Sequence, residues 1–259
     1  MKKSFNYYWR LLATGWSFSV FGIGGFLLWV LVFPILGLLP GDAKAKRQRA
    51  QKCVHHSFAI FINMMCRLGI MTYEIDGLEK LNRPGQLILA NHPTLIDIVF
   101  LLSRIPYASC IVKSQLCKNP CMRGSIAYAG YISNEDPETM IANCVEYLQA
   151  GGIMIIFPES TRTVPDVDYK FYRGAAAIAL QANVLVTPVI LHCVPSTLTK
   201  AEKWFEIPER KFHLSMRVND EILKDFVEIT PKSVAVRRFN TYLKEYFTQY
   251  REFHERNGR

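Results

Sequence analysis

The sequence predicts an α/β fold with a mixed, largely buried sheet flanked by helices, preceded by an N-terminal helical segment that associates with a membrane. Short apolar runs alternate with helix-like stretches over residues 72–259, which is the order expected of a sheet covered by helices. The 259 residues are 50% hydrophobic and 20% charged, which is enough for one substantial core and argues against disorder. We therefore divide the chain into a membrane anchor with an interfacial helix, residues 1–71, and an α/β domain, residues 72–259.

The anchor is predicted from residues 11–40, which carry no charge and lie between Arg10 and Asp42. One straight helix of this length would extend about 45 Å, whereas the hydrocarbon core is about 30 Å thick. We therefore expect a tilted span or a break at Pro34, and a re-entrant hairpin that never crosses also fits the sequence. A cleaved signal peptide fits less well, because the run is too long and no small-x-small cleavage site closes it.

Positive charge is concentrated near this segment: residues 1–52 hold eight Lys or Arg and one acid. A basic cluster next to an apolar run favours anionic lipid headgroups as partners, and we expect no nucleic acid. The cluster outweighs the cations before the run, which favours an inner-membrane protein whose α/β domain faces the cytoplasm. Its members are Lys44, Lys46, Arg47, Arg49 and Lys52.

A second helix is expected over residues 53–71, where polar side chains interrupt an apolar stretch. Its pattern suits an amphipathic helix in the membrane interface, and an ordinary core helix of the α/β domain is the alternative.

The α/β domain is predicted to begin at a strand near residue 72 and to end in an amphipathic helix. Pro137 just inside the start of one helix and Gly151 just past its end are good boundary signals. The expected strands are 72–75, 86–90, 108–112, 131–133, 153–157, 184–191 and 212–219. The expected helices are 94–103, 137–150, 174–182 and 233–253.

The most informative motif lies at the end of the second strand, where His92 is followed five positions later by Asp97. A histidine with a pKa near about 6.5 can take a proton from a hydroxyl at neutral pH. A carboxylate on its other ring nitrogen fixes the tautomer and stabilises the imidazolium. We predict that this pair is catalytic.

A second motif follows a later apolar run and reads Phe157-Pro158-Glu159-Ser160-Thr161-Arg162. It supplies a glutamate, two hydroxyls and an arginine, which is the residue suited to binding an anion. A surface ion pair between Glu159 and Arg162 is the alternative reading.

Together these motifs resemble the glycerolipid acyltransferase family, whose best-known members are 1-acyl-sn-glycerol-3-phosphate acyltransferases. The resemblance covers roughly residues 70–195. It implies that His92 deprotonates an acceptor hydroxyl, that Asp97 orients His92, and that the hydroxyl attacks the thioester of acyl-CoA or acyl carrier protein. Residues 72–259 are then an acyltransferase domain. The substrate-binding residues that we expect are Glu159, Ser160, Thr161, Arg162, Lys113 and Arg173, of which Lys113 and Arg173 match weaker motifs.

One departure from the family pattern concerns the acceptor. The family's second motif usually reaches an arginine that contacts phosphate, whereas Gly130-Tyr131-Ile132 here continues with Ser133-Asn134-Glu135-Asp136. Ser160 also replaces the usual glycine. Lysophosphatidate is therefore the default acceptor, with another hydroxylated lipid, such as an aminoacyl or polyene lipid, as the alternative. A third class is a non-catalytic membrane-binding protein, against which the intact His92 and Asp97 argue.

No cofactor or metal is expected, and the acyl thioester is a co-substrate. The remaining histidines lack the spacing of a zinc site, and phosphate-binding and dinucleotide-binding loops are absent from the sequence. Seven cysteines without a Cys-x-x-Cys pair favour a reduced compartment. The oligomeric state is left open.

Overall fold

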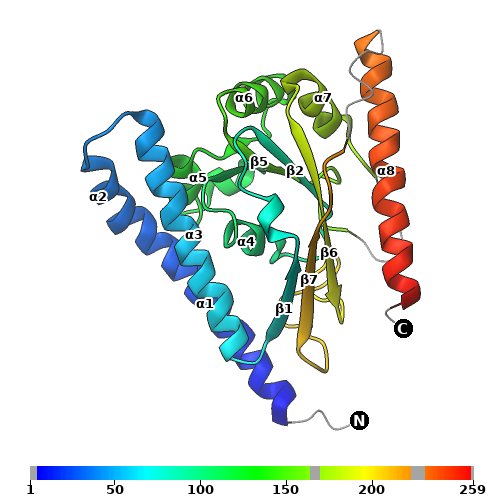
Figure 1. Ribbon diagram of the computed structural model, residues 1–259. Coiled ribbons are helices and arrows are strands. Elements are labelled where there is room, and N and C mark those ends of the chain that lie inside the picture. Colours follow the sequence, from blue (N-terminus) through cyan, green and yellow to red (C-terminus); the bar gives the residue numbers. More distant parts are fainter. Residues whose placement is uncertain (1–4, 164–169, 223–230, 258–259) are drawn as a thin grey trace.

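The computed structural model describes residues 5–163, 170–222 and 231–257, and it has three layers (Figure 1). A mixed sheet forms the middle layer. Helices α3 (Ala43–Arg67), α4 (Asp97–Leu102) and α5 (Arg123–Ala129) lie toward one face. Helices α6 (Pro137–Gln149), α7 (Arg173–Ala182) and α8 (Lys232–Asn257) cover the other. The predicted fold class, an α/β sheet flanked by helices behind an apolar N-terminal helix, is confirmed.

The sheet has seven strands in the order β1-β7-β6-β2-β5-β3-β4. All neighbours are parallel except β6 and β7, which are antiparallel, so the sheet is mixed as predicted. The strands are β1 (Met71–Asp76), β2 (Gln86–Ala90), β3 (Ala108–Val112), β4 (Ile132–Ser133), β5 (Ile153–Ile156), β6 (Leu185–Val194) and β7 (Phe212–Val218). Since β2, β5 and β6 run in parallel, the loops that follow them leave the same edge of the sheet.

The central strand β2 is buried throughout because it has an apolar layer on each face. Ile88 and Ala90 belong to the core on the α4 side, whereas Leu87 and Leu89 belong to the core under α6, α7 and α8. This alternation is the period-two pattern of a strand, with apolar residues on both faces because both faces are covered. β2 is thereby fixed in position up to Ala90, two residues before His92.

The helix boundaries agree with the sequence at α6 and α7 and differ at α4 and α5. The predicted helix 94–103 is shorter, because the Thr94 amide donates to the Asp97 side chain in a turn before the helix begins. Helix α5 was not predicted.

The N-terminal segment is one helical rod, formed by α1 (Phe5–Leu27), a π-helical turn (Leu28–Val32) and α2 (Phe33–Leu38). It does not break at Pro34. The Phe33 amide bonds to the Leu28 carbonyl one residue beyond the usual partner, and Pro34 lies in the first turn of α2, where a missing N–H costs little. In the described part of the chain, Phe5–Leu38 is the one helix that is long and apolar enough to cross a membrane, by length and composition alone.

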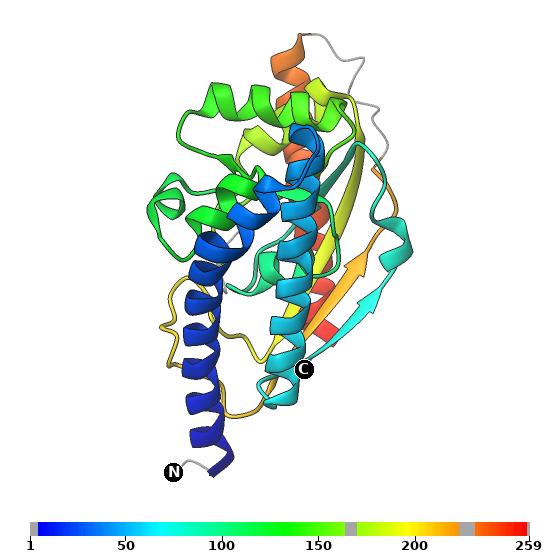
Figure 2. The ribbon, with the colours of Figure 1, turned by 90° about the vertical axis from the view of Figure 1, so that its left-hand side faces the viewer.

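Helix α3 begins at Ala43, ten residues before the predicted start, because Asp42 caps it by accepting a hydrogen bond from the Ala45 amide. The basic cluster therefore lies within α3. The inner face of α3 contributes Ile62 and Met65 to the core on the α4 side of the sheet. Figure 2 shows α1 and α3 side by side, and Phe21 of α1 packs against Phe58 of α3.

Candidate active site

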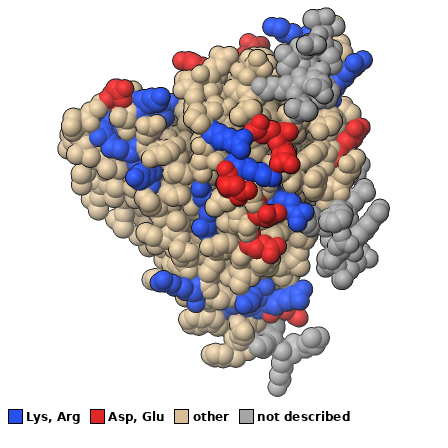
Figure 3. All heavy atoms as spheres, viewed as in Figure 1, with Lys and Arg blue, Asp and Glu red and all other residues tan. Residues whose placement is uncertain are grey.

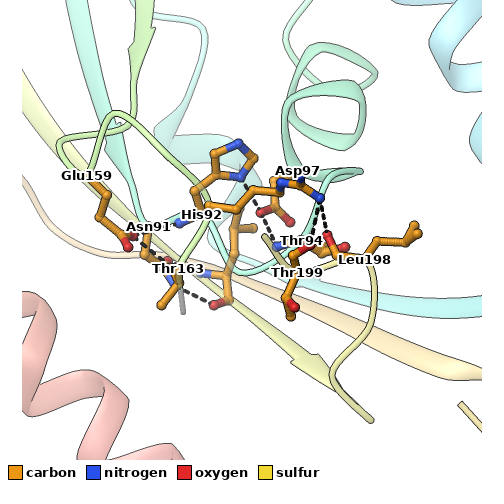
Figure 4. A network of polar contacts seen from close by, with 10 residues as sticks. Asn91, His92, Thr94, Asp97, Glu159, Thr163, Leu198 and Thr199 are labelled. Atoms are coloured by element: carbon orange, nitrogen blue, oxygen red, sulfur yellow. Dashed lines mark hydrogen bonds and ion pairs between the residues drawn. The ribbon is translucent and has the colours of Figure 1, made fainter. Parts of the chain in front are cut away.

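Three loops meet at the edge of the sheet where β2, β5 and β6 end, and His92 lies among them (Figure 4). The loop after β2 carries His92, and the loop after β5 carries Glu159. Asn91 ties the end of β2 to β6 through two hydrogen bonds with the backbone of Leu191, both 2.7 Å. This buried amide fixes the backbone directly before the histidine.

His92 and Asp97 form the pair that the sequence predicts. His92 Nδ1 lies 2.8 Å from Asp97 Oδ2, and the same oxygen accepts the Thr94 amide at 2.8 Å. Asp97 is the first residue of α4 and is fully buried, whereas 16% of the His92 side chain is exposed. A carboxylate on Nδ1 places the proton there and leaves Nε2 as the basic nitrogen.

The pair is held in an environment that excludes water from Asp97. Burial raises the pKa of Asp97 above its ordinary value, and the hydrogen bond from His92 opposes that shift. The ring of Phe157 stacks on His92 with centroids 4.1 Å apart and an angle of 18° between the planes. The imidazole is therefore restrained on one face by Phe157 and at Nδ1 by Asp97.

Glu159 holds the backbone of His92. Its Oε1 accepts the His92 amide and the Thr163 hydroxyl, each at 3.0 Å, and the Thr163 amide donates to the His92 carbonyl at 2.7 Å. Glu159 is buried, and burial raises its pKa to about 7, although both hydrogen bonds favour the ionised form. A residue predicted to contact the acceptor thus also fixes the backbone of His92. Sequence reasoning missed Thr163, whose only signal was its place four residues after Glu159.

Ser160 lies in the left-handed region of backbone space with φ 55°. A residue with a Cβ atom is disfavoured in this conformation, whereas glycine adopts it freely. The backbone at Ser160 is therefore in the left-handed conformation that favours glycine, which is the usual residue at this position of the family pattern. Its side chain is exposed, and Thr161 beside it is half-buried.

Arg162 binds backbone carbonyls at the site. Its Nη1 donates to the carbonyl oxygens of Leu198 and Thr199, both at 2.8 Å (Figure 4), and the Leu95 amide also donates to the Leu198 carbonyl. The arginine thereby joins the loop after β5 to the loop after β6. Nη2 and Nε make no hydrogen bond to the residues that the structure describes. Sequence reasoning missed these partners because a backbone carbonyl leaves no mark in the sequence.

Lys113 and Arg173 are not brought into the network around His92. Lys113 follows β3, two strands from β2 at the same edge of the sheet, and its side chain is exposed. Arg173 is exposed at the start of α7. Among the described residues, no group of three or more His, Cys, Asp or Glu is arranged to hold a metal ion.

Comparison with known proteins matches the motif-bearing part of the chain to a family. Residues 72–192 match the family described as Acyltransferase. The chain is 26% identical over 186 residues to the 1-acyl-sn-glycerol-3-phosphate acyltransferase of Pseudomonas aeruginosa, covering 70% of each chain. It is 26% identical over 133 residues to the enzyme of the same name from Helicobacter pylori, covering 49% of this chain and 56% of that one.

The fold is that of a solved structure. The 1-acyl-sn-glycerophosphate acyltransferase from Thermotoga maritima superposes with a TM-score of 0.67 and 20% identity, covering 93% of each chain. A chloroplastic relative from Arabidopsis thaliana is 28% identical over 144 residues, 53% of this chain and 40% of its own length. By these similarities the chain is an enzyme of the acyltransferase type, and its residues 72–192 match the Acyltransferase family. Within that family it is similar to the 1-acyl-sn-glycerol-3-phosphate acyltransferases.

Proposed function

We propose that this protein transfers a fatty acyl group from acyl-CoA or acyl carrier protein to the free hydroxyl of 1-acyl-sn-glycerol-3-phosphate, giving phosphatidic acid. The observation that carries the proposal is the contact of 2.8 Å between His92 Nδ1 and the buried Asp97. The names of the relatives in Pseudomonas aeruginosa and Helicobacter pylori support this acceptor.

In the proposed reaction, Nε2 of His92 takes the proton of the acceptor hydroxyl while its oxygen attacks the thioester carbonyl carbon. The tetrahedral intermediate then collapses, the carbon–sulfur bond breaks, and the thiolate leaves and takes up a proton. Asp97 stabilises the imidazolium through Nδ1. This proposed reaction requires no covalent acyl-enzyme, no metal and no resident cofactor, since the thioester is a co-substrate.

The acceptor phosphate is proposed to meet Arg162. Its Nη1 is engaged by the carbonyls of Leu198 and Thr199, so Nε and Nη2 are the donors left for an anion. Ser160 and Thr161 add hydroxyls beside it. Lys113 and Arg173 lie at the periphery as secondary cations.

A second acceptor class is favoured by one observation. After β4 the chain continues with Asn134, Glu135 and Asp136 where the family usually has an arginine, and Asp136 is used to cap α6. Loss of one charged hydrogen bond to phosphate would cost about 1.5–3 kcal/mol. A hydroxylated lipid without phosphate is therefore the competing acceptor.

Membrane association is proposed through the N-terminal helix, whose outward side is apolar and exposed. The helix contacts the rest of the protein along its length, since Gly25 lies against the Cys121 carbonyl and Phe33 stacks on Tyr128. We infer that it lies along the membrane surface with its outer side in lipid. In Figure 3 the surface over α1 and α2 shows few charged side chains, whereas Lys and Arg gather near the start of α3. This arrangement fits an inner membrane whose cytoplasmic face carries anionic lipid.

The test is an acceptor panel. Purified enzyme in detergent is given a radiolabelled acyl-CoA or acyl carrier protein with lysophosphatidate, a lysophospholipid whose phosphate is esterified, or a hydroxylated lipid without phosphate. The proposal predicts the highest kcat/KM for lysophosphatidate. A higher value for the phosphate-free lipid would replace the acceptor while keeping the acyl transfer, and absence of transfer to every acceptor would refute the proposal.

A further inference from the structure

The loop between β6 and β7, residues 195–211, connects the active site to the N-terminal helix. Its first part is buried at Thr197, Leu198 and Thr199, and the carbonyls of the last two accept Nη1 of Arg162. The loop then leaves the site. In Figure 2 it runs beside the lower half of α1.

Two glutamates fold the outer part of the loop into tight turns. Glu202 accepts the Thr199 amide at 2.9 Å, and Glu206 accepts the Lys203 amide at 2.7 Å. Their carboxylates are therefore occupied by backbone groups of the loop. Lys200 and Lys203 are exposed.

At the tip of the loop, two large aromatic side chains are exposed to solvent. Trp204 is 48% exposed and Phe205 is 45% exposed, and their rings meet edge to face with centroids 5.6 Å apart. Trp204 packs on α1: its ring lies 6.0 Å from that of Phe18, and a Cβ atom on Gly15 would lie 3.3 Å from it. The glycine therefore leaves the space that the indole uses.

A second contact fixes the returning part of the loop to the same helix. The guanidinium of Arg10 donates to the Glu209 carbonyl. The tip is thus held against α1 by two contacts, one at Trp204 and one at the Glu209 carbonyl. The outer faces of Trp204 and Phe205 then lie beside the exposed apolar side of the helix. The large apolar side chains exposed on the N-terminal helical rod, which includes α1 and the π-helical turn, are among others Leu12, Trp16, Ile23, Phe26, Leu27 and Leu31.

We propose that Trp204 and Phe205 form a second membrane-contacting element, which enters the lipid interface beside α1. The inference rests on the membrane association proposed above. Two observations point to lipid as the occupant. The exposed aromatic pair continues the apolar surface of α1, and the lysines beside it suit an anionic headgroup layer.

This position has a consequence for the reaction. The same short loop touches the membrane at Trp204 and holds Arg162 at Leu198 and Thr199. It therefore sets the height of the active site above the lipid, so that the acceptor hydroxyl reaches His92 while its acyl chain stays in the bilayer. Drawing the acyl chain into water is unfavourable because it exposes apolar surface, so matching this height favours catalysis.

Tryptophan fluorescence tests the contact directly. The chain has four tryptophans, and the other three, Trp9, Trp16 and Trp29, lie in the N-terminal helix. The emission of Trp204 is obtained as the difference between the wild type and Trp204→Phe, each in vesicles of phosphatidylglycerol and phosphatidylethanolamine. Vesicles whose acyl chains are brominated near the headgroup should quench this difference emission.

The quenching result separates the two proposals. Quenching of the helix tryptophans without quenching of Trp204 would overturn the loop proposal and keep the membrane helix. Absence of quenching for all four would contradict the membrane association itself.

Activity gives the second readout. Trp204→Ser with Phe205→Ser should raise the KM for an acceptor presented in vesicles by about tenfold, because apolar area is lost from the interface, and should leave the KM in detergent micelles unchanged. Tyr107→Ser, a matched exposed aromatic just before β3 and at the opposite edge of the sheet, should change neither.

Two outcomes would overturn the proposal on this readout. An equal loss in vesicles and micelles would show that the loop only supports the site. A selective rise in the KM for acyl carrier protein, with acyl-CoA unaffected, would assign Trp204 and Phe205 to the carrier protein instead of lipid.

Discussion

At the scale of single residues, His92 is held on one ring face, at Nδ1 and at its backbone by groups that its immediate sequence only partly predicts. Asp97 was predicted because it lies five residues away in a familiar spacing. Phe157, which stacks on the ring, and Thr163, which closes the loop on Glu159, lie 65 and 71 residues later in the chain. Their roles depend on the parallel pairing of β2 and β5, which local sequence does not encode.

Replacing Ser160 by glycine tests the backbone conformation of the site loop. Ser160→Gly should raise the free energy of unfolding by about 1 kcal/mol, because glycine adopts a φ of 55° without strain. This corresponds to an increase of about 2–4 °C in Tm for a chain of this size, measured by thermal unfolding. The control is Thr161→Gly, at a position without a positive φ, which should lower Tm. A lower Tm for Ser160→Gly would contradict the account.

The buried Glu159 should make stability depend on pH. Its pKa is raised to about 7 in the folded protein, whereas the unfolded chain has the ordinary value of 4.5. Between these values the folded state binds more protons, so the free energy of unfolding falls as pH rises from 4.5 to 7.

The matched variant is Glu159→Gln, which keeps an oxygen acceptor for the His92 amide and cannot ionise. Relative to wild type, its free energy of unfolding should increase by about 2–3 kcal/mol between about pH 5 and pH 8. Urea unfolding at the two pH values measures this difference. A difference that does not change with pH would show that Glu159 is ionised throughout.

At the scale of elements, the sequence predicts best where local signals mark both ends of a helix or strand. Pro137 and Gly151 bracket α6, and the observed helix ends one residue before the predicted end. Helix α5 has such a signal only at its end, where Gly130 adopts the left-handed conformation, and its burial comes from contacts with α3 and the N-terminal helix. The start of α3 was missed because the cap at Asp42 was read only as the end of the apolar run.

The connection between the β5 and β6 loops depends on Arg162. Arg162→Ala should speed hydrogen exchange of the backbone around Leu198 and Thr199, because the Nη1 donor that binds both carbonyls is lost. Hydrogen-exchange mass spectrometry measures this, and Arg162→Lys, which retains a cation, is the control for charge.

The same variant tests the proposed phosphate contact. For Arg162→Ala, the KM for lysophosphatidate should rise about tenfold or more, while the KM for the thioester donor changes little. An equal rise in the KM for an acceptor without phosphate would show that Arg162 acts only through its contact with the loop after β6.

At the scale of the whole molecule, the apolar helix, the loop tip and the active site form one arrangement. The sequence predicts the apolar segment and the pair of His92 and Asp97 separately. It left open whether the segment spans the membrane, because that depends on contacts such as Phe33 with Tyr128, which are far apart in sequence.

Charges on the outer side of the helix test its contact with lipid. Leu12 and Ile23 are 72% and 62% exposed, so Leu12→Glu with Ile23→Glu should fold normally. Binding to anionic vesicles in a flotation assay should fall by about tenfold or more, because each carboxylate must stay hydrated in the interface. Unchanged flotation with unchanged Tm would contradict a lipid-facing helix.

The central claim is that His92, oriented by Asp97, is the general base of acyl transfer. The most direct measurement is the rate of acyl transfer from acyl-CoA to lysophosphatidate by purified His92→Ala in detergent, compared with wild type and with His56→Ala, an exposed histidine on α3. The account predicts a loss of roughly 10²–10⁴-fold for His92→Ala, a smaller loss for Asp97→Asn, and full activity for His56→Ala, with all three variants folded at the assay temperature. Turnover by His92→Ala close to the wild-type rate would contradict it.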